Sequence, residues 1–309
     1  MPPYAFFDGK FVPLAEAKIG IMTHAFNYGT ACFEGIRGNW NEEQGQMYIF
    51  RLAEHYQRLL ESCRVLQIEI PRTKDELFAL TIELVQRCGY REDTYIRPMA
   101  YKSSEQVGVR LHNLEASFLL FAIPFGPYLD ITKGAKCCVC SWRRIDSSMI
   151  PPRAKINGLY VNSALAKTEA VEKGFDEAIL LTHDGHVSEG SGENIFLIID
   201  GQLVTPPSSD NILIGITRDT VITLAKSELG IETIERSIAP GELYTADECF
   251  LTGTAAHVTP VTEIDHRKVG RGEVGDITKK LQALYFDVIL GKSKRYLDWC
   301  TPAYKLVKA

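Results

Sequence analysis

The chain has 309 residues, 45% of them hydrophobic and 24% charged, with a formal net charge of -5, which offers no basic excess for binding nucleic acid. Because single cores usually stop growing at roughly 250 to 300 residues, this length predicts two domains. The first residues resemble neither a secretory signal nor a transit peptide, and no run of about 18 apolar residues predicts a membrane span, so a cytoplasmic protein is expected.

The first part of the chain predicts a sheet accompanied by helices. Asp8-Gly9 between two apolar runs is a hairpin signal. Apolar residues recur at helical spacing over 52–63, and Thr73 with Glu76 forms the capping-box pattern that starts a second helix. Strands are then predicted at 95–101 and 117–124.

Turn-forming residues without periodicity occupy positions 125–134 and predict an interdomain linker. It separates a small N-terminal domain, residues 1–124, from a larger C-terminal domain, residues 135–309. Strands are predicted there at 135–142, 178–181 and 195–199, and helices at 161–173, 215–230 and 274–290. Helices and strands do not alternate one for one, which favours an α+β fold over a doubly wound one.

The eight cysteines lie at irregular positions, as reduced thiols of a cytoplasmic protein do. Cys137 and Cys140 form a C-x-x-C pattern, but they lie in a predicted strand, where positions three apart point to opposite faces. We therefore expect core thiols rather than a redox pair, and we expect no metal site.

Two segments carry groups that pyridoxal phosphate requires, an amine and an anion. Lys155 stands at the entrance of a helix among small and apolar residues, which favour a nucleophilic amine by desolvating it. Glu193 ends the segment 188–193 (SEGSGE) directly before an apolar strand, where a carboxylate would keep the pyridine nitrogen protonated. A solvated lysine and an exposed acid in a turn remain the alternatives.

Three further segments offer phosphate ligands. Residues 215–217 open a helix, whose first amides and dipole attract a phosphate, although Thr217 is equally suited to be an ordinary N-cap. Thr254 belongs to a turn of small residues, for which a plain turn is the alternative. Arg58 lies on the helix predicted over 51–65 and is either a phosphate ligand or a solvated charge.

The sequence as a whole resembles the fold-type IV pyridoxal phosphate enzymes, and within them the branched-chain aminotransferases. This resemblance implies a two-domain fold with a smaller N-terminal α/β domain and a larger C-terminal mixed α/β domain built as a pseudo-barrel. It rests on seven segments in the family's order: His24–Gly29, Phe33–Arg37, Tyr95–Pro98, Lys155–Tyr160, Ser188–Phe196, Gly215–Asp219 and Thr252–Ala256.

The resemblance also implies a role for each candidate residue. Lys155 would form the imine with pyridoxal phosphate, Glu193 would pair with the pyridinium, and Tyr160 would donate to the phenolic oxygen. The phosphate would be bound by Arg58, Ile216, Thr217 and Thr254. The substrate would meet Phe33, Gly35, Tyr95, Arg97, Tyr128, Thr254 and Ala255, together with Tyr28 of the partner subunit, Val107 of the partner subunit and Val109 of the partner subunit.

The implied reaction moves the amino group of L-leucine, L-isoleucine or L-valine to 2-oxoglutarate in a homodimer or larger homo-oligomer. Phe125, where relatives often carry tryptophan, and the unfamiliar loop 102–106 leave the width of the substrate pocket open. Other enzymes of the same fold remain alternatives, namely D-amino acid or (R)-amine transaminases and aminodeoxychorismate lyase. A non-catalytic phosphate-binding protein is the alternative from another class.

Overall fold

The computed structural model describes residues 3–126 and 128–304, and the chain forms two compact units. Unit 1 consists of Met1–Gly126, Ala154–Gly158 and Asp287–Ala309, and unit 2 consists of Pro127–Arg153 and Leu159–Phe286. These units differ from the predicted division at the linker 125–134, because that division assigns residues 154–158 and 287–309 to the C-terminal domain. Both segments join unit 1 through backbone hydrogen bonds to its strands, which no local sequence pattern reveals.

The sheet of unit 1 has the strand order β17-β5-β4-β6-β7-β1-β2, with β3 paired to β6. The predicted hairpin is confirmed: β1 and β2 pair antiparallel, and Asp8 and Gly9 between them have φ values of 48° and 79°. The strands are β1 (Tyr4–Phe7), β2 (Lys10–Pro13), β3 (Ala31–Phe33), β4 (Ile36–Asn41), β5 (Gln46–Phe50), β6 (Thr94–Lys102), β7 (Ala116–Pro124) and β17 (Cys300–Pro302).

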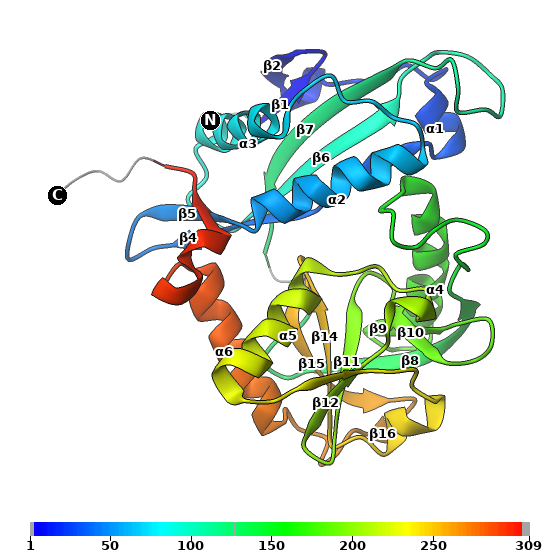
Figure 1. The fold of residues 1–309 in the computed structure, drawn as a ribbon, viewed down its shortest axis with the longest axis vertical. Coiled ribbons are helices and arrows are strands. Elements are labelled where there is room, and N and C mark those ends of the chain that lie inside the picture. Colours follow the sequence, from blue (N-terminus) through cyan, green and yellow to red (C-terminus); the bar gives the residue numbers. More distant parts are fainter. Residues whose placement is uncertain (1–2, 127, 305–309) are drawn as a thin grey trace. The chain divides into compact units, whose positions relative to one another are not determined.

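Unit 1 also contains α1 (His24–Tyr28), α2 (Leu52–Val65) and α3 (Lys74–Cys88), and α2 and α3 pack against each other beside the sheet (Figure 1). The predicted capping box is confirmed, since Thr73 accepts from the Glu76 amide and the Glu76 carboxylate accepts from the Thr73 amide. The apolar faces of the helices meet the sheet in a fully buried core of Tyr56, Leu59, Leu77, Leu84, Ile96 and Leu120.

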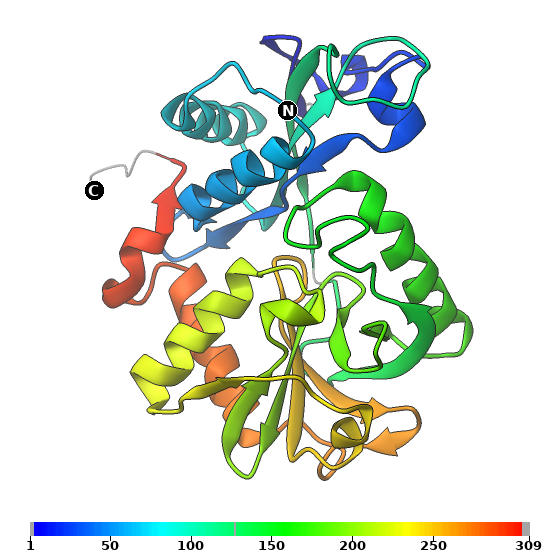
Figure 2. The ribbon, with the colours of Figure 1, turned by 45° about the vertical axis from the view of Figure 1, so that its right-hand side comes forward.

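The sheet of unit 2 has the strand order β10-β9-β8-β15-β14-β11-β12-β13, with β16 paired to β15, and it curves strongly (Figure 2). Parallel and antiparallel pairs occur together, so the expected mixed α/β class is confirmed. The strands are β8 (Ala135–Arg143), β9 (Glu177–Leu181), β10 (Val187–Gly190), β11 (Asn194–Ile199), β12 (Gln202–Thr205), β13 (Thr233–Glu235), β14 (Glu248–Gly253), β15 (His257–Ile264) and β16 (Arg267–Lys268).

Three more α-helices are present: α4 (Tyr160–Glu172), α5 (Ile216–Leu229) and α6 (Asp276–Ile289), and the last residues of α6 belong to unit 1. Cys137 and Cys140 lie on opposite faces of β8 and belong to different hydrophobic cores, as the strand periodicity predicts. Within residues 3–126 and 128–304, no helix has the length and apolar character that crossing a membrane requires.

Candidate active site

Lys155 is held by its backbone between two elements of unit 1. Its amide donates to Ser62 Oγ on α2 at 3.0 Å, and its carbonyl accepts from the Phe33 amide at 3.1 Å. Its Nζ lies 5.0 Å from the centroid of the Phe33 ring, and the residue is half-buried. The lysine amine therefore lies against an aromatic face instead of extending fully into solvent.

Arg58 does not extend into solvent from α2 but binds a buried carboxylate. Its Nε donates to Glu34 Oε1 at 2.7 Å and its Nη2 to Glu34 Oε2 at 2.8 Å. His55 Nδ1 lies 2.7 Å from Glu34 Oε2, and the Glu34 side chain is fully buried. Burial raises the pKa of Glu34, but the charge and hydrogen bonds of Arg58 outweigh burial and bring this pKa to about 2.

A cluster of aromatic rings surrounds Arg97 on β6. Its guanidinium carbon lies 4.3 Å from the Phe33 ring centroid, and Nη2 donates to the Tyr95 hydroxyl at 2.7 Å. A Cβ atom at Gly35 would lie 2.3 Å from the Tyr95 hydroxyl oxygen, so the cluster requires glycine there. Arg97 Nε is buried without a hydrogen-bond partner in the described part of the chain, which argues against a structural ion pair.

Tyr28 and the loop that contains Val107 and Val109 are joined by hydrogen bonds. The Gly108 amide donates to the Tyr28 hydroxyl at 3.1 Å, and His24 Nε2 lies 2.9 Å from the Gly108 carbonyl oxygen. The two valine side chains are 74% and 91% exposed. The structure thus fixes the backbone of this loop while its apolar side chains face solvent.

In unit 2, Glu193 lies directly before β11 and is 4% exposed, so the alternative of an exposed acid is wrong. A Cβ atom at Gly253 would lie 3.4 Å from Glu193 Cγ, which places the turn with Thr254 and Ala255 beside this residue. Burial, followed by the charge of Glu177, raises the pKa of Glu193 to about 8.

The start of α5 fits a phosphate group. Gly215 is the N-cap, so the alternative of an N-cap at Thr217 is wrong, and glycine has no side chain with which to cap the first amides. A Cβ atom at Gly215 would lie 2.1 Å from Asn194 Oδ1, so only glycine brings this turn to the start of β11. The first turn holds Ile216 and the buried Thr217, whose amides and hydroxyl are typical phosphate ligands.

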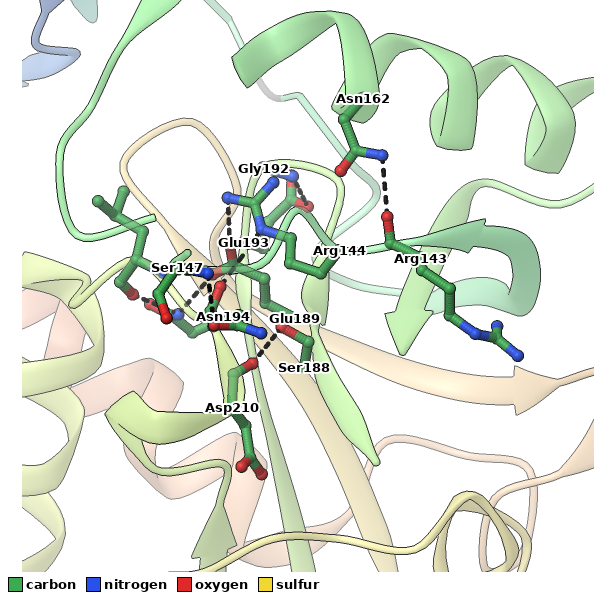
Figure 3. Close-up of polar contacts among 12 residues, drawn as sticks. Arg143, Arg144, Ser147, Asn162, Ser188, Glu189, Gly192, Glu193, Asn194 and Asp210 are labelled. Carbon is green, nitrogen blue, oxygen red and sulfur yellow. Dashed lines mark hydrogen bonds and ion pairs between the residues drawn. The ribbon is translucent and has the colours of Figure 1, made fainter. Parts of the chain in front are cut away.

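The sequence prediction missed a second buried carboxylate, Glu189, which is tied to the same turn (Figure 3). Its Oε1 lies 2.8 Å from Arg144 Nη2, and its Oε2 accepts from Asn194 Nδ2 and from the Leu213 amide, both at 3.0 Å. Asn194 Nδ2 also donates to the Leu213 carbonyl at 2.8 Å. The two glutamates belong to one short motif, and the sequence does not indicate that both are buried.

The remaining candidates lie on the same two units. Tyr160 is the first residue of α4, shortly after Lys155 in the chain. The Tyr128 ring centroid lies 5.1 Å from Lys167 Nζ, which pairs with the buried Glu177 at 2.7 Å. Unit 1 therefore carries Lys155, Arg58, Phe33, Gly35, Tyr95, Arg97, Tyr28, Val107 and Val109, and unit 2 carries Glu193, Tyr160, Ile216, Thr217, Thr254, Ala255 and Tyr128.

The lysine amine against an aromatic ring in unit 1, and the buried carboxylates and phosphate-type helix start in unit 2, are groups of the kind that an enzyme using pyridoxal phosphate requires. The family described as amino-transferase class IV matches residues 31–264. The chain belongs to this family, and it is an aminotransferase that uses pyridoxal phosphate.

Its similarity to individual proteins extends over nearly the whole chain. It is 54% identical over 301 residues to a probable branched-chain-amino-acid aminotransferase of Aquifex aeolicus (strain VF5), covering 97% of each chain. The branched-chain aminotransferase of Thermoproteus uzoniensis, solved with norvaline, has a TM-score of 0.93 and 47% identity, with 97% and 99% of the chains covered. The branched-chain amino acid aminotransferase of Thermobaculum terrenum, solved in its PLP form, has a TM-score of 0.94 and 38% identity, with 98% and 99% covered.

Proposed function

We propose that this enzyme transfers the amino group of L-leucine, L-isoleucine or L-valine to 2-oxoglutarate in a ping-pong reaction. The observation that carries the proposal is the cluster of Phe33, Tyr95 and Arg97 in the unit that holds Lys155. Such a substrate site must accept an apolar side chain in one half-reaction and a carboxylate in the other, and aromatic rings around a guanidinium suit both. The names of the relatives support branched-chain amino acids as the substrate class.

The cofactor and substrate roles that we propose are those that the sequence resemblance implies. Bound pyridoxal phosphate supplies an electron sink for the electron pair left on the substrate Cα. Lys155 would hold the cofactor, and its amine would move the proton at the substrate Cα. Tyr160 would donate to the phenolic oxygen. The phosphate would be bound by Arg58, Ile216, Thr217 and Thr254.

Substrate groups are recognised by side chains and amides of different character. The Arg97 guanidinium, with the hydroxyl groups of Tyr95 and of Tyr28 of the partner subunit, binds the distal carboxylate of glutamate. The amides of Thr254 and Ala255 bind the α-carboxylate. The apolar side chain meets Phe33, Gly35, Tyr128, Val107 of the partner subunit and Val109 of the partner subunit.

The pyridine nitrogen has two candidate acceptors. The sequence prediction names Glu193, whose pKa burial raises to about 8, which disfavours its anionic form. Glu189, in contrast, forms an ion pair with Arg144 and accepts from the Leu213 amide, shortly before the phosphate-type helix start. Because a pyridinium requires an anionic acceptor, these contacts favour Glu189 over Glu193 for this role.

Substrate class is tested by following the cofactor spectrum of the purified enzyme in separate half-reactions with L-leucine, D-alanine and (R)-1-phenylethylamine. We expect rapid loss of the cofactor absorbance with L-leucine, because the apolar rings around Arg97 accept its isobutyl group. Recovery of the absorbance on adding 2-oxoglutarate identifies the second substrate. Rapid reaction with D-alanine or (R)-1-phenylethylamine, but not with L-leucine, would contradict the proposal and identify one of the related enzymes.

We also propose a homodimer or larger homo-oligomer, because unit 1 exposes a set of apolar side chains. Phe26 on α1 is 66% exposed, and the side chains of Val107 and Val109 are also mostly exposed. The loop that contains the two valines is hydrogen-bonded to His24 and Tyr28 of α1. Large exposed apolar patches are typical of protein interfaces. The buried thiols of all eight cysteines suit the reducing cytoplasm, which is the location that we propose.

The replacement Val109→Asp is expected to weaken this association, because burying an unpaired carboxylate in an interface is costly. Sedimentation of the wild-type enzyme should give at least a dimer, and the variant should dissociate at higher concentration and lose activity with it. Val171→Asp, at an exposed apolar position of α4, is the matched control and should leave the mass unchanged. A fully active wild-type monomer would exclude the proposed oligomer.

A further inference from the structure

Glu34 carries a buried negative charge that the proposed reaction does not use. Its carboxylate takes two parallel hydrogen bonds from Arg58, of 2.7 and 2.8 Å, and lies 2.7 Å from His55 Nδ1. Burial lowers the pKa of His55, so its neutral ring donates the Nδ1 proton to Glu34. Glu34 is therefore the acceptor that fixes the plane and the direction of the Arg58 guanidinium, because paired parallel hydrogen bonds leave the guanidinium little freedom to rotate.

The same residues are linked to the backbone of Lys155 from two sides. The Lys155 amide donates to Ser62 Oγ at 3.0 Å, and the Ser62 hydroxyl donates to the Arg58 carbonyl at 2.8 Å. On the other side, the Lys155 carbonyl accepts from the amide of Phe33, the residue directly before Glu34. The Glu34 amide itself donates to the Pro98 carbonyl at 2.9 Å.

Lys155 is thus bound between α2 and the end of β3, and the pair of Arg58 on α2 with Glu34, the residue directly after β3, joins these two elements. We propose that Glu34 is a positioning residue that fixes the position of the Arg58 guanidinium relative to Lys155. The two side chains would thereby match the fixed spacing between the phosphate and the carbonyl carbon of pyridoxal phosphate. This inference rests on the proposed roles of Arg58 and Lys155.

A purely structural role for Glu34 makes a different prediction. A buried ion pair whose charge serves only the fold would change stability without distinguishing one ligand from another. A residue that orients Arg58 instead affects the binding of ligands that carry a phosphate and leaves the binding of ligands without a phosphate unchanged. Pyridoxal, which has the same ring and carbonyl carbon but no phosphate, separates the two roles.

The experiment measures the dissociation constants of pyridoxal phosphate and pyridoxal for the full-length apoenzyme. In Glu34→Gln, the preference for the phosphorylated form should fall about 10-fold or more, since a hydrogen bond to a charged group contributes roughly 1.5–3 kcal/mol. Pyridoxal should bind as in the wild type. Arg58→Gln should show the same loss, and the double variant should lose no more than either single variant.

Two variants complete the design. Glu54→Gln removes a half-exposed carboxylate from the same helix, where it pairs with Arg51 at 2.7 Å, and should leave both constants unchanged. Glu34→Asp keeps the charge and should restore part of the preference. If Glu34→Gln does not fold, His55→Leu replaces it, because leucine cannot donate to Glu34 and should lower the same preference to a smaller extent.

Equal losses of pyridoxal phosphate and pyridoxal binding in Glu34→Gln would overturn the inference, as would an unchanged preference in the folded Glu34 or His55 variant. Additive effects in the double variant would overturn it too. Failure of the wild-type protein to bind pyridoxal phosphate is a separate result, since it would refute the proposed function before Glu34 is tested.

Discussion

Replacement of Lys155 by alanine is expected to lower the transamination rate by about 10⁴-fold or more, because one amine both binds the cofactor and moves the Cα proton. Ser62 and Phe33 hold the backbone at this position, so the variant should keep its fold. The rate is measured with L-leucine and 2-oxoglutarate. Borohydride reduction of the wild-type enzyme, followed by peptide mass analysis, should find the cofactor attached to Lys155.

Lys173→Ala is the matched control, since this exposed lysine at the end of α4 pairs with Glu169 at 2.6 Å. It should retain wild-type activity and still carry the cofactor on Lys155. A Lys155 variant with full activity, or reduced cofactor attached to another lysine, would remove the central assumption of the mechanism.

The two buried carboxylates of the segment 188–194 are expected to respond very differently to replacement by glutamine. Glu189→Gln should lower kcat by about 10²-fold, because the neutral amide no longer stabilises a positive pyridine nitrogen. Glu193→Gln should stay within about 10-fold of the wild type, because burial raises the pKa of this carboxyl group and already disfavours its anionic form. Steady-state rates at pH 7 compare the two variants.

Stability measurements provide an independent readout for Glu193. Its pKa in the folded protein lies above the ordinary value of 4.5, so its contribution to stability is fully present below about pH 4.5 and is lost as the pH rises through about 8. Glu193→Gln cannot ionise, so between these pH values the cofactor-free variant should lose less free energy of unfolding than the wild type. A large fall in kcat for Glu193→Gln, with Glu189→Gln unaffected, would return the pyridine role to Glu193.

Local signals in the sequence predicted much of the fold. The Asp8-Gly9 hairpin and the capping box at Thr73 depend on residues within a few positions of each other, and both are present. The helix after Gly215 and the strand after Glu193 were predicted for the same reason. The division into units was not, because residues 154–158 join unit 1 through hydrogen bonds to residues about 90 to 130 positions away in the chain.

The sequence by itself determined the α+β class and the order of the motifs, through the periodicity of apolar residues and the turn and capping residues between them. Only the tertiary structure decided which charges are buried and what they contact. It placed Arg58 on Glu34, brought Glu189 to the turn before α5, and raised the pKa of Glu193. Burial and long-range pairing depend on segments that are distant in the chain, so no pattern within one motif reports them.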